Sequence, residues 1–278
     1  MLFEETTSIL KKYNIKPKKD LSQNFLIDNW VFQRIIDELQ PNNDDTVFEI
    51  GSGIGVITKY IAPLVKKIIA CEIDPNFAKI IEEGAPENLE VINEDILKLD
   101  LSFLPEKTKV IGNIPYHITT STIMHLLLKS HIFSFIILTI QYDVGKRIIA
   151  QKGKEYGILS VVTQIWTKPK IVMKIPPSSF LPMPKPFSCL IRLDINKKSL
   201  VRPNPFFFEI VDTLFSQRRR KIINSLSSLI TKKNASIILE NANIDSSLRP
   251  ESLSIFDFER IANEYTLFKT KSQIPQLS

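Results

Sequence analysis

Residues 47–55 read Val-Phe-Glu-Ile-Gly-Ser-Gly-Ile-Gly. The first four form a short, mostly apolar run that is typical of a buried strand. A helix is expected from Val56 to about Lys66, with a bend or an end near Pro63. A strand, a Gly-rich turn and a helix in this order are typical of sites that hold nucleotides. The dinucleotide pattern has a further glycine where this chain has Val56, so the turn alone does not define the ligand.

Four further strand-like segments follow this turn and are separated by helical patterns: 68–72, 89–92, 110–113 and 133–140. Such alternation predicts βαβ units and a parallel sheet, and hence an α/β fold. Ligands of these sheets bind at the carboxyl ends of the strands. Several polar or small residues fall at these ends: Gly51, Glu72, Asp95 and Asn113.

Two carboxylates suggest which nucleotide the turn would hold. Glu72 ends the second strand, about 20 residues after the turn, where an acidic group accepts both hydroxyls of a ribose. Asp95 follows the third strand and could accept from the amino group of an adenine. With Gly51 and Gly53 allowing close approach of the backbone, this set predicts S-adenosylmethionine as cofactor. A nicotinamide dinucleotide is an alternative that fits less well.

The stretch Lys109-Val-Ile-Gly-Asn-Ile-Pro-Tyr116 ends the fourth strand in an unusual turn. Pro115 keeps Ile114 extended, so the Asn113 side chain and the Ile114 carbonyl offer two acceptors beside the ring of Tyr116. We expect them to hold the amino group of an adenine and to aim its lone pair at the sulfonium methyl, with Tyr116 stacked on the base. Catalysis would come from alignment and dipoles, without a metal. An ordinary strand-to-helix turn is the alternative.

Composition limits the class of protein. The 278 residues carry 36 Lys+Arg against 30 Asp+Glu, a mild excess that favours polyanionic partners. The two cysteines and three histidines show neither zinc-ligand spacing nor a disulfide framework, which suits a cytoplasmic protein. The longest apolar run, Ile132 to Ile140, is too short to span a bilayer, so no membrane association is expected. Without a coiled-coil pattern, a monomer is expected.

Three parts of the chain are expected: a basic arm over 1–22, the methyltransferase domain over 23–196 and a helical RNA-binding domain over 197–278. Pro17 disfavours a regular helix over Lys11 to Lys19, and segment 156–166 could be helix or strand. Helices are expected over 206–215, 219–230, 235–241 and from about 256.

Basic residues in two of these parts are candidates for contact with RNA phosphates, with a solvated surface as the alternative reading. They are Lys18, Lys19, Arg218, Arg219, Arg220 and Lys221.

Five motifs occur in this order: Gln-Asn-Phe-Leu at 23–26, Glu-Ile-Gly-Ser-Gly-Ile-Gly at 49–55, Asn-Ile-Pro-Tyr at 113–116, Phe-Leu-Pro-Met-Pro-Lys at 180–185 and Phe-Ser-Gln-Arg-Arg-Arg-Lys at 215–221. In this respect the sequence resembles ribosomal RNA adenine N6,N6-dimethyltransferases, over nearly the whole chain, and most of all the small-subunit branch. The resemblance implies a Rossmann-like, seven-stranded class I methyltransferase sheet with a small all-helical C-terminal domain. The implied substrate is a pair of adjacent adenines in the 3′-terminal hairpin of the small-subunit (16S) RNA, methylated during subunit assembly.

Site residues carry over from the family by position. The implied cofactor site comprises Asn24, Leu26, Gly51, Glu72, Asp95 and Asn113. Phe180 matches an aromatic residue that sandwiches the target base with Tyr116, and a core-anchoring phenylalanine is the alternative.

The chain departs from the family pattern at Tyr142, where a lysine is common, and at Pro186, where valine is usual. Two other functions stay open. One is a large-subunit (23S) adenine methyltransferase that confers antibiotic resistance, and the other is a non-catalytic role in ribosome assembly. A DNA adenine methyltransferase fits less well, because those enzymes commonly carry aspartate where Asn113 stands.

Overall fold

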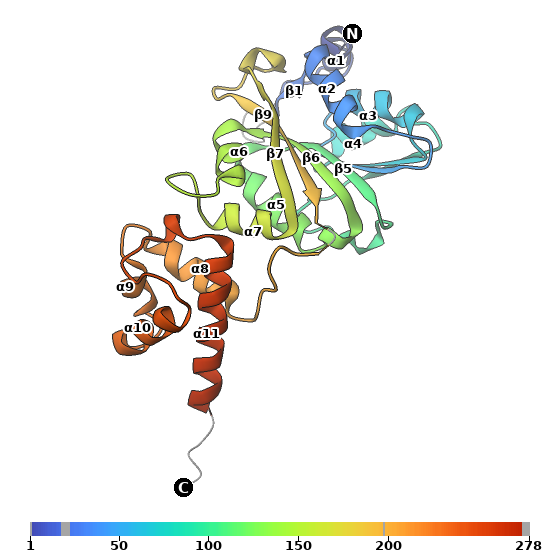
Figure 1. The fold of residues 1–278 in the computed structure, drawn as a ribbon. Helices are drawn as coiled ribbons and strands as arrows, with labels where there is room; N and C mark the ends of the chain where they lie inside the picture. The colour runs from blue at the N-terminus through green and yellow to red at the C-terminus, as the bar shows by residue number, and fades with distance from the viewer. Residues whose placement is uncertain (1, 18–22, 197, 274–278) are drawn as a thin grey trace. The chain divides into compact units, whose positions relative to one another are not determined.

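The computed structural model describes residues 2–17, 23–196 and 198–273. Two compact units are present (Figure 1): residues 1–146 with 167–197, and residues 147–166 with 198–278. The expected boundary near 197 and the observed division therefore differ at one segment, because 147–166 clusters with the C-terminal helices. In the part of the chain that the structure describes, no helix combines the length and apolarity that a bilayer crossing needs.

The first unit is built on a seven-stranded sheet in the order β4-β3-β2-β5-β6-β9-β7. The strands are β2 (Thr46–Ile50), β3 (Lys67–Cys71), β4 (Leu89–Ile92), β5 (Thr108–Asn113), β6 (Phe133–Gln141), β7 (Thr167–Ile175) and β9 (Ser188–Ile195). The strands β2 to β6 pair in parallel, and β9 pairs antiparallel with both β6 and β7. This confirms the predicted α/β fold and its strand number.

Helices and 3-10 turns precede, connect and follow the parallel strands. They are α2 (Asn29–Leu39), α3 (Val56–Ile61), η2 (Ala62–Leu64), α4 (Pro75–Glu82), η3 (Leu101–Phe103), η4 (Tyr116–Ile118), α5 (Thr119–Leu127), η5 (Ser130–Ile132) and α6 (Tyr142–Ile149). The helix expected to bend or end near Pro63 ends at Ile61 and continues as a 3-10 turn, since Pro63 has no amide hydrogen to donate.

The absence of a regular helix that is expected over Lys11 to Lys19 is confirmed for residues 13–17, whereas Lys11 and Lys12 end a helix. Helix α1 (Leu2–Lys12) is regular, and Leu2, with 1% of its surface exposed, packs in one cluster with Ile54, Val56 and Phe77. Apolar residues on one helical face drive this packing, whereas Pro17 lies beyond the end of the helix. Lys18 and Lys19 lie outside the described residues.

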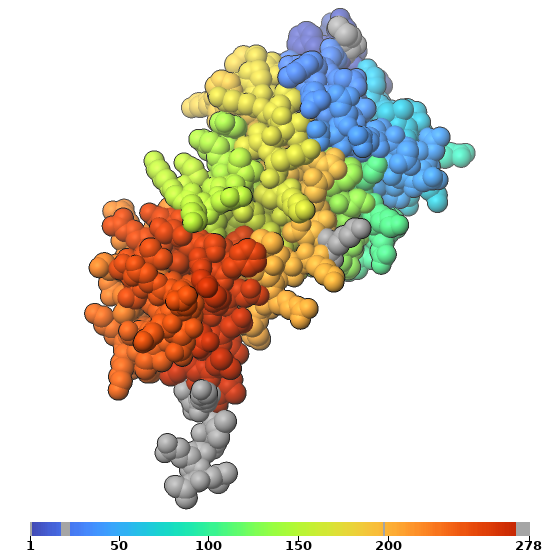
Figure 2. All heavy atoms as spheres, in the orientation of Figure 1, coloured from blue at the N-terminus to red at the C-terminus, as the bar shows by residue number. Residues whose placement is uncertain are grey.

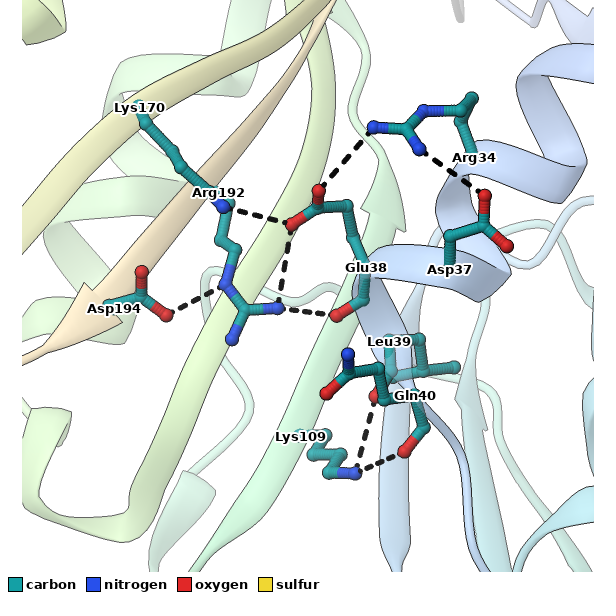
Figure 3. Close-up of polar contacts among 9 residues, drawn as sticks. All are labelled: Arg34, Asp37, Glu38, Leu39, Gln40, Lys109, Lys170, Arg192 and Asp194. Carbon is teal, nitrogen blue, oxygen red and sulfur yellow. Dashed lines mark hydrogen bonds and ion pairs between the residues drawn. The ribbon is translucent and has the colours of Figure 1, made fainter.

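Ion pairs tie the end of α2 to the sheet (Figure 3). The Glu38 carboxylate contacts Arg34, Lys170 at 3.2 Å and Arg192 at 3.7 Å, and the Arg192 guanidinium also donates to the Glu38 carbonyl. Lys109 of β5 donates to the Gln40 carbonyl at 2.8 Å. These contacts hold α2, and therefore residues 23–26 just before it, in a defined place against the sheet.

The second unit is helical: α7 (Ile158–Trp166), α8 (Phe207–Ser216), α9 (Ile222–Leu226), α10 (Lys232–Asn241), η7 (Pro250–Ser252) and α11 (Ile255–Gln273). Its core contains Phe207, Leu214 and Phe258, all fully buried. The helix expected over 219–230 is shorter than predicted, and Arg218, Arg219 and Arg220 lie in the turn that precedes α9.

Candidate active site

A pocket opens at the carboxyl ends of β2, β3 and β5, as expected for an open α/β sheet. The structure brings together in its lining every residue predicted for catalysis or for cofactor binding: Asn24, Leu26, Gly51, Gly53, Glu72, Asp95, Asn113, Ile114, Pro115, Tyr116 and Phe180. The candidate RNA-contacting residues Arg218 to Lys221 belong to the second unit and are not part of this lining.

Asn113 is the last residue of β5, and a contact with the N-terminal segment orients its side chain. Its Nδ2 donates to the Asn24 carbonyl at 2.7 Å. Because a carbonyl oxygen only accepts hydrogen bonds, this contact determines which way the amide is turned and leaves Oδ1 as the group available to accept. The next residue, Ile114, donates its N–H to the Thr139 carbonyl at 3.1 Å, so the backbone of the turn is anchored to β6.

The position of Tyr116 is determined by the backbone before it and by a contact of its phenol oxygen. Pro115 is extended (φ −54°, ψ 134°) and directs the chain into the 3-10 turn that begins at Tyr116. The phenol oxygen of Tyr116 lies 2.8 Å from Oγ of Ser188, the first residue of β9. Burial raises the pKa of Tyr116, so the phenol stays neutral. Nothing in the sequence near Ser188 indicated this contact, because Ser188 lies 72 residues after Tyr116 in the chain.

Glu72 connects β3 to the glycine turn. Its carboxylate accepts from the amides of Gly53 at 2.8 Å and Asp74 at 2.9 Å. Gly53 has a φ of +58°, and a Cβ there would come within 3.1 Å of the Phe25 ring, so glycine is needed at this position. Burial raises the pKa of Glu72. One lone pair on each carboxylate oxygen remains to accept from a ligand hydroxyl.

Asp95 lies at the next strand end and is partly engaged in its own turn. Its Oδ1 accepts from the amide of Leu97 at 3.0 Å, and its backbone carbonyl accepts from the amides of Lys98 and Leu99. This Asx-type turn holds the carboxylate at the rim of the pocket, with Oδ2 as the oxygen that a bound amino group could use.

A buried acid that we did not single out as a site residue lies under the glycine turn. Glu49 is 4% exposed, and Thr58 of α3 donates its hydroxyl to Oε2 at 2.6 Å. Burial is the main reason that the pKa of Glu49 rises to about 7, with the charge of Glu72 adding to the effect. The signal was present in the sequence, since Glu49 is the one charged residue in an otherwise apolar strand.

A two-stranded ladder forms one wall of the pocket and was also not foreseen. Strand β1 (Phe25–Leu26) pairs antiparallel with β8 (Phe180–Leu181), which places Leu26 opposite Phe180. The Ser179 hydroxyl donates to the Asp28 carboxylate at 2.7 Å and reinforces the pairing. Phe180 is 3% exposed, so it is both a packed residue and a wall of the pocket.

Helix α1 contributes one residue, Thr6, to the lining of the pocket. Thr6 is fully buried, and its Oγ1 has no hydrogen-bond partner among the residues that the structure describes. Because a buried hydroxyl without a partner costs roughly 1–3 kcal/mol, its place in the lining makes it a candidate contact for a bound ligand.

Comparison with known proteins assigns the chain to a family. The family described as ribosomal RNA adenine dimethylase matches residues 14–267. The chain belongs to this family. Among the relatives of this ribosomal RNA adenine dimethylase is the ribosomal RNA small subunit methyltransferase A of Alkaliphilus oremlandii, 40% identical, with 94% of this chain and 96% of the relative covered. The protein of the same description from Clostridium botulinum is 39% identical, with 93% and 97% covered.

Solved structures share the fold of this dimethylase. A dimethyladenosine transferase from Plasmodium falciparum superposes with a TM-score of 0.77 at 24% identity, covering 87% of this chain and 98% of that one. The 23S rRNA methyltransferase ErmE gives a TM-score of 0.68 at 23% identity, covering 87% and 99%. The predicted resemblance to adenine dimethyltransferases and the class I methyltransferase fold are therefore confirmed.

Proposed function

We propose that the chain transfers methyl groups from S-adenosylmethionine to N6 of two adjacent adenines in the 3′-terminal hairpin of small-subunit (16S) ribosomal RNA. The observation that carries the proposal is the orientation of the Asn113 side chain. Its Nδ2 donates to the Asn24 carbonyl, so Oδ1 remains available to accept a hydrogen bond from an amino group. The similarity to small-subunit methyltransferases over more than nine-tenths of the chain supports the choice of RNA.

The residues of the pocket fit S-adenosylmethionine. Glu72 has lone pairs that can accept from the ribose hydroxyls, and Asp95 has an oxygen that can accept from the adenine amino group. The buried Thr6 hydroxyl has no hydrogen-bond partner among the described residues. When bound, the cofactor supplies a methyl group activated by a sulfonium.

The catalytic turn would act by positioning the target nitrogen. The lone pair of an adenine amino group is delocalised into the ring, which makes it a poor nucleophile. Acceptance of its two hydrogens by Asn113 Oδ1 and the Ile114 carbonyl would turn the lone pair toward the methyl group. Alignment of this kind contributes up to roughly 7–11 kcal/mol. Tyr116, whose phenol is hydrogen-bonded to Ser188, and Phe180 would stack on the two faces of the base.

Phosphate contacts are proposed for the turn before α9, in which one arginine has a structural role and the following cations contact RNA. Arg218 donates to the Lys154 carbonyl at 2.8 Å and pairs with Glu251 at 3.4 Å, so it holds the turn within the second unit. Arg219, Arg220 and Lys221 are exposed and are the cations that we assign to the RNA backbone.

The test is methyl transfer from labelled S-adenosylmethionine to unmethylated small subunits, with large subunits in parallel. We expect label on the small subunit alone and reverse-transcription arrest at two adjacent adenines near the 3′ end of its RNA. Label on the large subunit alone would contradict the proposal and indicate a large-subunit (23S) adenine methyltransferase instead. Binding of small subunits without methyl transfer, by a protein that still binds the cofactor, would leave an assembly role.

A further inference from the structure

The pocket at the carboxyl ends of the strands is acidic, although the whole chain carries a formal net charge of +6. Among the described residues that line it, none is a lysine, an arginine or a histidine. The carboxyl groups of the lining belong to Glu49, Glu72, Glu94 and Asp95. The proposed reaction uses Glu72 and Asp95, and it leaves the two other carboxyl groups without a role.

Burial distinguishes Glu49 from Glu94. Glu49 is 4% exposed, whereas Glu94 is an exposed residue. The Glu49 carboxylate accepts hydrogen bonds from the hydroxyls of Thr58, at 2.6 Å, and Ser52, and both donors are uncharged. None of the described residues gives this carboxylate a cationic partner. Glu49 is therefore a buried acid whose charge the protein itself does not neutralise.

Two further features indicate that a ligand completes this pocket and that protein, not water, surrounds it on one side. The buried Thr6 hydroxyl belongs to the lining and has no hydrogen-bond partner among the described residues. The ladder of β1 and β8 forms one wall, and in Figure 2 the blue atoms of the N-terminal part of the chain meet yellow atoms of its middle part at the surface of the first unit. Charges in such a site interact through protein, so they affect one another more strongly than in bulk water.

The titratable groups that face the pocket come from β2, from β3 and the residue after it, and from the turns after β4 and β5. Burial is the main reason that the pKa of Glu49 rises to about 7, and the charge of Glu72 adds to this effect. Burial also raises the pKa of Glu72, but backbone amides that donate to its carboxylate act in the opposite direction. Cys71, whose pKa burial raises to about 12, and Tyr116, whose pKa burial also raises, stay neutral. Helices α1, α2 and α3 add no titratable side chain to the described lining.

We propose that Glu49 is the residue by which the pocket distinguishes the cationic cofactor from the product of methyl transfer, which has one positive charge fewer. The inference rests on the proposed function, which supplies S-adenosylmethionine as the cofactor. Loss of the methyl group turns the sulfonium into a neutral thioether, and the adenine, ribose and amino-acid parts are the same in S-adenosylhomocysteine. Glu72 and Asp95, proposed to contact the ribose and the adenine, therefore meet the same groups in both molecules.

Glu49 differs from these two acids because its effect depends on charge and not on a shared hydroxyl or amino group. A buried carboxylate without a cationic partner stabilises a sulfonium more than a thioether in the same pocket. This preference would favour replacement of the product by fresh cofactor before the next methyl transfer.

Linkage gives the sign of the pH dependence. A cation bound in the pocket favours the ionised form of Glu49, so the pKa of Glu49 is lower in the complex than in the free protein. S-adenosylmethionine should therefore bind with release of a proton, and its affinity should increase as the pH rises toward about 7 and reach a plateau above it. The thioether lowers this pKa less, so the affinity for S-adenosylhomocysteine should depend less on pH.

Titration calorimetry with both ligands tests the proposal without RNA. A change of one unit in a pKa corresponds to a tenfold change in affinity. We expect the Kd of S-adenosylhomocysteine divided by that of S-adenosylmethionine to rise about tenfold between about pH 5.5 and pH 7.5, and Glu49→Gln to lose most of this rise. The amino groups of the ligands titrate at about pH 8 whichever protein is used, so comparison of wild type with variant removes their contribution.

A second measurement needs no variant. Binding heats of the wild-type protein at about pH 6.5, in buffers of different ionisation enthalpy, give the number of protons released. More protons should be released with S-adenosylmethionine than with S-adenosylhomocysteine.

Glu94→Gln is the matched control, because it makes the same chemical change in an exposed carboxyl group of the same lining. Solvent screens an exposed charge, so Glu94→Gln should keep the wild-type ratio of Kd values at both pH values. If Glu49→Gln keeps it as well, or if both ligands release equal numbers of protons, Glu49 does not select for charge and the proposed function stands. If the wild-type protein binds neither ligand, the proposed cofactor is wrong and the inference fails with it.

Discussion

The side-chain amide of Asn113 donates a hydrogen bond to the backbone carbonyl of Asn24, 89 residues earlier in the chain. The residue proposed to hold the target nitrogen is thus oriented by the segment proposed to cover the cofactor. The two substrates of the reaction would meet across this single contact.

Asn113→Asp tests that relationship, because a carboxylate cannot donate to the Asn24 carbonyl and the two oxygens would repel each other. We expect kcat for methyl transfer to fall by roughly 10²–10³, the usual effect of losing one preorganised hydrogen-bonding group. The measurement is kcat and KM for both substrates, with calorimetric binding of S-adenosylmethionine showing that the pocket is folded. An unchanged kcat would exclude a catalytic role for the amide.

The wild-type and Glu49→Gln proteins should differ in their free energy of unfolding by an amount that depends on pH. The pKa of Glu49 rises from about 4.5 in the unfolded chain to about 7 in the folded one, so the folded protein binds the extra proton between these values. The stability of the wild-type protein relative to Glu49→Gln should therefore be greatest below about pH 4.5. It should decline by up to roughly 3 kcal/mol as pH rises past 7. Urea unfolding at pH 5 and pH 8 measures the change, and a constant difference would contradict it.

Thr6→Val should have opposite effects on stability and on binding. Removing a buried hydroxyl that has no partner should leave the free energy of unfolding of the cofactor-free protein equal or higher. If Oγ1 contacts the cofactor, the Kd for S-adenosylmethionine should rise about 3- to 10-fold, the worth of one hydrogen bond.

Thr122 gives the matched control for this substitution. Its Oγ1 is also buried without a partner among the described residues, but Thr122 does not line the pocket. Thr122→Val should leave the Kd unchanged. A Thr6→Val protein that binds the cofactor as tightly as Thr122→Val would remove Thr6 from the site.

Arg219→Ala combined with Arg220→Ala should weaken RNA binding mainly at low salt. Each phosphate contact contributes roughly 0.7–0.9 to the slope of log K against log salt concentration, so the double variant should lower that slope by about 1.5. Lys232→Ala with Lys233→Ala removes two exposed cations from α10 in the same unit and serves as the control. Equal slopes for the two variants would show that Arg219 and Arg220 make no phosphate contacts.

The sheet and the turn from Asn113 to Tyr116 were predictable because their signals are local. An apolar run such as Val47 to Ile50 and the restriction that Pro115 places on Ile114 both act within a few residues. The pairing of β1 with β8 was not predictable, since a strand of two residues has no periodicity and its partner lies far along the chain. Segment 147–166 likewise joins the helical unit through packing that no local pattern reports.

The ladder between β1 and β8 has a consequence for how binding of one substrate affects binding of the other. Leu26 lies opposite Phe180, so whatever stiffens one strand stiffens the other. If the cofactor reduces the motion of β1, the protein loses less conformational entropy when a base then binds beside Phe180. Linkage requires that the bound base raise the affinity for the cofactor by the same factor. The pairing of two residues in β1 with two in β8 would then couple the binding of the two substrates, without any movement of the sheet.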